Sequence, residues 1–169
     1  ALGLDIQSKA QREGLRAAAK PILADVKARI SAIGAEDTGH MLRSTKLRVR
    51  TFKKKRRFGA DGVDMQVEIG VFKNRKETPI RISSSGKVVK GVDAPTRAWW
   101  VEHGTKAHSL GKGSRAANRK GESKGARHPG TTAKPFLRPA LKSNAQTAVS
   151  TVKETIAQRI KRIARNRRG

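Results

Sequence analysis

The chain of 169 residues carries 39 Lys and Arg against 13 Asp and Glu, a formal net charge of +26, with 36% hydrophobic and 4% aromatic residues. The length fits one domain, and the lack of Cys excludes a disulfide scaffold, thiolate chemistry and Cys-ligated metal sites. No apolar run approaches the roughly 20 residues that span a bilayer, and no secretory signal is visible at the start. We therefore expect a soluble protein, made inside a cell, that faces a polyanion or an acidic protein.

The first predicted element is an amphipathic helix from Asp5 to Ile33. Its apolar positions follow steps of three and four residues, and Gly34 is placed to end it. Pro21 lies inside this pattern, so we expect either a kink or a first short segment that ends near Lys20. The apolar positions are Leu15, Ala18, Ala19, Ile22, Val26, Ile30 and Ile33.

The pattern then changes to an alternation of period two, which predicts two strands with one buried face. The first strand centres on 47–52 and the second on 63–71. The run 53–57 and the Gly-rich run 59–62 would join them as a basic hairpin finger. Phe52 and Phe58 flank this finger, and we favour their packing on the apolar face over their stacking on bases.

The next predicted elements are short. Residues 80–82 and 88–89 flank a Ser-Gly run and predict a second hairpin, and Ala94 to His103 predicts a short helix. Residues 105–133 are rich in Gly, Ser, Lys and Arg, which predicts a long mobile basic loop. The elements make a single α+β domain over 1–169.

A second long helix is predicted from Pro139 to Ala164, followed by a basic tail at 165–169. Its apolar side chains form one stripe at helical spacing. The basic residues of its last turn suit the negative end of the helix dipole. The members of the stripe are Leu141, Ala145, Val149, Val152, Ile156, Ile160 and Ile163.

The positive charge is concentrated in three segments. Residues 41–60, 105–141 and 142–169 have net charges of +9, +8 and +7, whereas 1–40 and 61–104 have +1 each. Lys and Arg without interleaved acids favour contact with phosphates or an acidic protein surface. The candidate contact residues are Lys53, Lys54, Lys55, Arg56 and Arg57 in the finger and Lys112, Arg115, Arg119, Lys120, Lys124 and Arg127 in the loop.

The residues do not favour an enzyme. The four histidines lack the spacing of a metal site, and the few carboxylates are scattered rather than paired for two-metal chemistry. His103 follows Glu102 directly, and adjacent residues on a helix point in different directions. We therefore expect no catalytic residues, no bound metal and no cofactor.

Three stretches together resemble the tail-completion, or neck, protein family of long-tailed bacteriophages. They are Asp37–Ser44, Ala98–Thr105 and Lys134–Leu141, in the order and spacing of the family's motifs. The chain departs from the family around Trp99 and Trp100, and its 105–133 loop is longer and more basic than usual. The motif residues, which we interpret as folding determinants first and interface residues second, are Asp37, Thr38, Gly39, Leu42, Ser44, Trp100, Val101, Glu102, Gly104, Thr105, Pro135, Phe136, Leu137, Pro139 and Ala140.

The resemblance implies a structural virion protein of the phage neck, made in the bacterial cytoplasm. Such a protein completes the head-proximal end of the tail and joins it to the head, forming a ring, most often of six copies, around the DNA channel. Its implied partners are further copies, the tail terminator and the head connector or stopper proteins, with genome DNA phosphates or the tape-measure protein as further contacts, and no membrane. The alternative is a free nucleic-acid-binding protein without sequence preference, which a salt titration would distinguish.

Overall fold

A computed structural model describes residues 4–34, 39–54, 62–73, 80–82, 88–109 and 127–166. The chain forms two compact units, one of Ala1–Phe72 with Phe136–Gly169 and the other of Lys73–Pro135. Long helices, antiparallel strands and a short helix confirm the predicted α+β class. In the described part of the chain the strands form three separate two-stranded antiparallel sheets.

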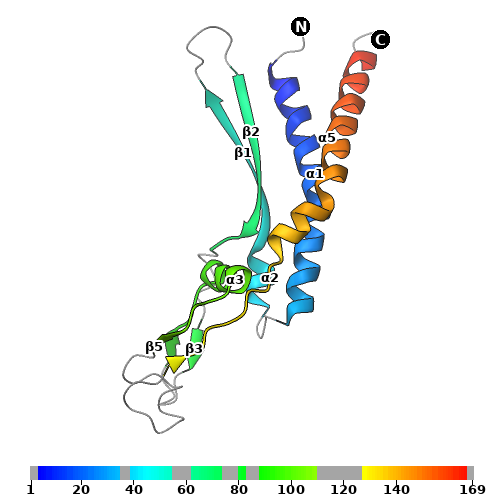
Figure 1. Cartoon of the computed structure of the whole chain (residues 1–169). Helices are drawn as coiled ribbons and strands as arrows, with labels where there is room; N and C mark the ends of the chain where they lie inside the picture. The colour runs from blue at the N-terminus through cyan, green and yellow to red at the C-terminus, as the bar shows by residue number, and fades with distance from the viewer. Residues whose placement is uncertain are drawn as a thin grey trace. The chain divides into compact units, whose positions relative to one another are not determined.

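Two 30-residue helices, α1 (Leu4–Ile33) and α5 (Leu137–Asn166), pack side by side in the first unit (Figure 1). They run antiparallel, because Asp25 of α1 contacts Ser143 near the start of α5, while Glu13 pairs with Arg159 near its end. Gly14 permits close approach, since a Cβ there would lie 3.2 Å from Ile156 Cγ1. The absence of a side chain at Gly14 therefore lets the two helices approach closely at this point.

The predicted first helix is confirmed as α1, which begins at Leu4, one residue before the predicted Asp5, and ends at the predicted Ile33. The helix continues through Pro21 to Ile33, so no separate segment ends near Lys20. Gly34 has a φ of +62°, and its N–H donates to the Ser31 carbonyl at 3.1 Å. Glycine adopts this left-handed conformation without the Cβ clash that other residues meet, which explains the helix end.

Only part of the apolar stripe predicted for α5 packs on α1. Leu141 is 58% exposed, Val149 51% and Ile160 42%. The half-buried positions of the middle of α5 are instead mainly small or polar, namely Asn144, Ala148, Thr151, Val152, Thr155, Ile156 and Arg159. Within the stripe, Val152, Ile156 and Ile163 are half-buried, and Gly14 of α1 lies against the first two, so α1 covers one edge of the stripe.

The predicted basic hairpin is confirmed as β1 (Thr45–Lys54) and β2 (Gly62–Val71), which pair antiparallel and pack on α1. Leu47 faces Ile69 in the register, and Val49 faces Val67. A five-residue helix that the sequence did not predict, α2 (His40–Ser44), leads into β1. The Thr45 hydroxyl donates to the Met41 carbonyl at 2.8 Å, which closes this turn.

The second unit contains the predicted second hairpin and short helix. Strands β3 (Ile80–Ile82) and β4 (Val88–Lys90) pair antiparallel, and α3 (Ala94–His103) has its predicted bounds. Asp93 caps α3, because its Oδ1 accepts the Thr96 N–H at 3.1 Å. Such a cap satisfies a helix N–H that would otherwise have no acceptor.

The prediction of one loop over 105–133 is wrong at its ends. Strands β5 (His108–Ser109) and β6 (Arg127–His128) pair antiparallel, and Thr105 forms a bridge with Thr131. We call residues 105–109 and 127–131 the histidine ribbon. The amino-acid composition of this segment did not predict strands, because backbone hydrogen bonds rather than apolar side chains hold the ribbon together.

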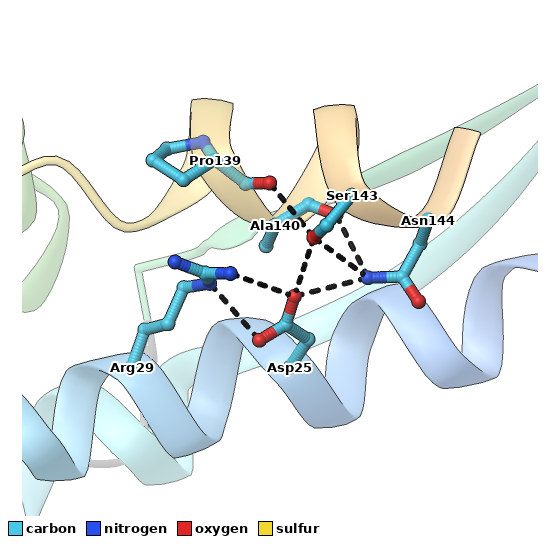
Figure 2. A network of polar contacts seen from close by, with 6 residues as sticks. All are labelled: Asp25, Arg29, Pro139, Ala140, Ser143 and Asn144. Carbon is cyan, nitrogen blue, oxygen red and sulfur yellow. Dashed lines mark hydrogen bonds and ion pairs between the residues drawn. The ribbon is translucent and has the colours of Figure 1, made fainter.

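A polar network centred on Asp25 joins α1 to the start of α5 (Figure 2). Arg29 donates to both Asp25 oxygens, at 2.9 and 3.3 Å. Ser143 Oγ and Asn144 Nδ2 each lie 3.0 Å from Asp25 Oδ2, and Asn144 also donates to the Ala140 carbonyl. The hydrogen bond from Arg29 lowers the pKa of Asp25 below 3.8, and those from Ser143 and Asn144 contribute in the same direction.

This lowered pKa predicts an acid-sensitive contact between the two helices. A carboxylate with a lower pKa in the folded chain stabilises the fold above its unfolded pKa, and the stabilisation is lost as the pH falls through the folded value. Wild type should therefore be more stable than Asp25→Asn at pH 7, and the difference should shrink as the pH falls below 3.8. Urea denaturation of both proteins over this pH range tests it; a constant difference would contradict it.

Candidate polyanion-binding surface

Three cations stand in a row on the outer side of the β1–β2 hairpin. Lys46, Arg48 and Arg50 alternate with Leu47 and Val49, so the basic side chains point away from the apolar side of the hairpin. All three are exposed, whereas Leu47 and Val49 are half-buried. We call Lys46, Arg48 and Arg50 the basic face.

The neighbours of the basic face leave it positively charged. The residues opposite on β2 are Gly70, Glu68 and Gln66, so one carboxylate faces three cations. Arg50 Nε lies 3.2 Å from Glu68 Oε2, with the two side chains 53% and 25% exposed. An exposed pair of this kind contributes about 0–1 kcal/mol, so a phosphate can compete for Arg50.

Arg48 is held in place by an aromatic ring. Its Cζ lies 3.8 Å from the centroid of Phe72, the residue that follows β2. This cation–π contact holds the guanidinium near the ring, and the guanidinium has five N–H groups with which to donate. Arg48 is therefore oriented in advance for a phosphate or carboxylate.

The hairpin that carries the basic face is fixed to α1. Arg12 of α1 donates to Thr51 Oγ1 at 3.0 Å, and the Phe72 N–H donates to the Ser44 carbonyl at 2.9 Å, closing the base of the hairpin. A site on a rigid strand pays less ordering entropy on binding than one on a free loop.

The finger residues continue the same strand. The sequence predicted Lys53 and Lys54 in the tip of the finger, and this prediction is wrong. They are the last residues of β1 and pair with Val63 and Gly62. Lys55, Arg56 and Arg57 lie outside the described residues. Basic residues therefore occur along the whole of β1, from Lys46 to Lys54.

Of the six candidate loop residues, one is described. Arg127 is exposed in β6 and pairs with Ser109. The flanking Thr105 and Thr131 exchange two backbone hydrogen bonds of 3.0 Å, so the residues on either side of 110–126 are held together. The other five candidates, Lys112, Arg115, Arg119, Lys120 and Lys124, lie outside the described residues.

Two histidines of the ribbon stack on one another. The His108 and His128 rings have centroids 5.0 Å apart and planes inclined by 22°. His128 Nδ1 accepts the Gly130 N–H at 3.0 Å, and His108 Nδ1 lies 3.0 Å from the Lys106 carbonyl. These contacts are local to the ribbon, so we assign both rings a structural role there.

The motif residues mainly occupy places where the backbone turns or the core closes. Gly39 and Gly104 have φ values of +65° and +72° at the start of α2 and the end of α3. Phe136 and Ala140 are fully buried where α5 begins. These positions agree with the interpretation of the motifs as folding determinants.

The remaining motif residues differ in exposure. Glu102 is 6% exposed, in contrast to Trp100 at 40%. Asp37 and Thr38 lie outside the described residues. Ser44 is buried, Pro135 is exposed, and the half-buried members are Leu42, Val101, Thr105, Leu137 and Pro139.

Glu102 and His103 differ in their surroundings. The His103 ring stacks on Trp99 with centroids 5.0 Å apart, and its Nδ1 lies 3.1 Å from the Trp99 carbonyl. His103 is exposed, whereas Glu102 is buried. The two side chains thus lie in different environments, as expected of neighbours on a helix.

Within the described residues, no three His, Asp or Glu side chains are grouped so as to hold a metal ion. In the same part of the chain, no helix combines the length and apolar character needed to cross a membrane.

The basic face was missed by reasoning from sequence alone. The signal was present, because Arg48 and Arg50 alternate with apolar residues. Segment charges, however, drew attention to the denser run that follows.

Comparisons with protein-family models, curated proteins and solved structures found no match.

Proposed function

We propose that this chain is a structural protein of a phage virion, located in the neck, which completes the head-proximal end of the tail and joins it to the head connector. Copies would form a ring, most often of six, around the DNA channel. The observation that carries the proposal is the basic face, three cations with one facing carboxylate on a rigid hairpin. The resemblance of the three motifs to the neck family supports it from the sequence.

The charge of the chain supports a negative partner. Each copy has a net charge of +26, and like charges brought together in a ring repel one another over about a Debye length, about 8 Å at physiological salt. DNA phosphates in the channel, or acidic surfaces of adjoining rings, would offset this repulsion. The basic face is the described surface best arranged for that contact.

The contact is tested by removing the basic face. In the triple variant Lys46→Gln, Arg48→Gln, Arg50→Gln, we expect the slope of log K against log salt for duplex DNA to decrease in magnitude by about 2–3, since each phosphate contact contributes about 0.9. The measurement is filter binding of the purified chain at rising salt.

A matched control removes the same charge elsewhere. The variant Lys9→Gln, Lys20→Gln, Lys27→Gln changes three exposed lysines of α1 and should leave the slope near that of wild type. Equal slopes for the two variants would contradict the assignment of the basic face. Circular dichroism of both variants confirms that the fold is retained.

The place in the neck needs a separate measurement. Native mass spectrometry of the chain, and imaging of phage particles that contain it, should show a closed ring at the head–tail junction. A monomer that binds DNA tightly and is absent from particles would instead indicate the free nucleic-acid-binding protein.

A further inference from the structure

The outward side of α5 carries an apolar stripe that α1 covers only along one edge. Val149 and Ile160 are 51% and 42% exposed, and Ala145 is exposed as well. Val152 and Ile156 are half-buried at the edge toward α1. Exposed apolar side chains that follow one row along a helix, unlike scattered single ones, are typical of a surface that binds a partner.

The stripe follows an eleven-residue repeat. In residues 142–152 a lysine is followed by apolar residues three, seven and ten positions later, and residues 153–163 repeat this pattern. An eleven-residue repeat averages 3.67 residues per turn, so it stays almost in line along a helix. We define the outer stripe as Ala145, Val149, Val152, Ile156, Ile160 and Ile163, with Lys142 and Lys153 preceding its two halves.

The spacing indicates that the partner is a helix. Steps of three and four residues are those by which packed helices interdigitate their side chains. DNA phosphates would leave the aliphatic groups of Val149 and Ile160 in water. Helices that bind membranes use Trp, Phe or Leu, whereas the outer stripe consists of Ala, Val and Ile, with one exposed Leu, Leu141, directly before it.

The charges around the stripe indicate an acidic partner. Lys142 and Lys153 are exposed, and α5 has seven basic residues and one acidic residue, Glu154. A second copy of α5 would bring like charges together, whereas a helix with Asp and Glu beside its apolar residues would complement them.

We propose that the outer stripe of α5 is the docking surface for an amphipathic α-helix of another protein, with apolar residues at three- and four-residue steps and acidic residues beside them. This inference rests on α5 alone and does not depend on the neck function. The two can therefore fail separately.

The probe is a synthetic peptide of two eleven-residue repeats, with Leu at the three apolar positions of each repeat, Glu beside them and Ala elsewhere. The comparison peptide has Lys in place of Glu. Fluorescence anisotropy with the full chain should show binding of the acidic peptide at least tenfold tighter than binding of the basic one. Equal affinities, or no binding of the acidic peptide, would overturn the proposal.

Variants then locate the site. Val149→Ser with Ile160→Ser changes two exposed residues, so the fold should survive, and we expect the Kd for the acidic peptide to rise about tenfold. The control, Thr147→Ser with Gln158→Ser, changes exposed positions on another side of α5 and should not alter the Kd. Equal effects of the two variants would refute the site.

Two further measurements distinguish other occupants. In sedimentation velocity, self-association that Val149→Ser with Ile160→Ser abolishes would show that a second copy occupies the stripe. Binding to vesicles of phosphatidylserine and phosphatidylcholine that is lost in the same variant would show a membrane surface. Either result would overturn the proposal, and we expect neither.

Discussion

Replacing Phe136 with Ala is expected to lower the free energy of unfolding by about 3–5 kcal/mol, as for other fully buried aromatic residues. Phe136 is 0% exposed and is the largest of the fully buried side chains. It directly precedes α5, whose first residue is Leu137. The substitution would leave a cavity where the chain enters this helix. Urea denaturation followed by circular dichroism at 222 nm (about the α-helical minimum) measures the loss.

Two control variants separate burial from position. Leu141→Ala removes an apolar side chain one turn further along α5 that is 58% exposed, so it should change stability by only about 0.5 kcal/mol or less. Phe136→Leu keeps most of the apolar volume and should lose clearly less than Phe136→Ala. Similar losses for Phe136→Ala and Leu141→Ala would show that the buried ring does not anchor α5.

The sequence predicted elements that depend on local periodicity. The end of α1 follows from the apolar steps and from Gly34, and the two strands β1 and β2 follow from the alternation of apolar and polar residues within each. Both signals lie within a few residues of one another, so no tertiary information was needed. Phe136, one of the motif residues interpreted as folding determinants, is fully buried where the last helix begins.

The orientation of α5 could not be predicted in this way. An apolar stripe normally marks the buried side of a helix, but here Gly14 of α1 lies against one edge of the stripe, at Val152 and Ile156, and the rest is exposed. The Asp25 network fixes this orientation through Ser143 and Asn144, which are distant in sequence. Neither feature has a periodic signature, because each becomes a contact only after the two helices pair.

The candidate site, too, could be predicted from the sequence only in part. Charge density located the 41–60 segment, but strand alternation decides which cations share the basic face, and the ring that Arg48 contacts belongs to Phe72, the residue after β2. In the histidine ribbon the holding contacts are backbone hydrogen bonds between Thr105 and Thr131. Such bonds are available to any sequence, so composition predicted a loop there.

Replacing Gly130 with Ala is expected to open the histidine ribbon. Gly130 has a φ of +89°, and a Cβ there would overlap the Thr105 carbonyl oxygen and lie 3.1 Å from the Ala107 nitrogen. The backbone strain and the clash should together cost roughly 3 kcal/mol. Because 1.4 kcal/mol is a factor of ten, hydrogen-exchange protection of the Thr105 and Thr131 amides should fall roughly a hundredfold.

Gly34 provides the control for this prediction, because it shares the left-handed backbone but not the crowding. Its φ is +62°, and a Cβ there would have no other atom within 4 Å. Gly34→Ala should therefore cost only the backbone preference, about 1 kcal/mol, and should leave the protection of Thr105 and Thr131 unchanged. If Gly130→Ala kept wild-type protection at these two amides, close approach of the backbone at Gly130 could not be what holds the ribbon together.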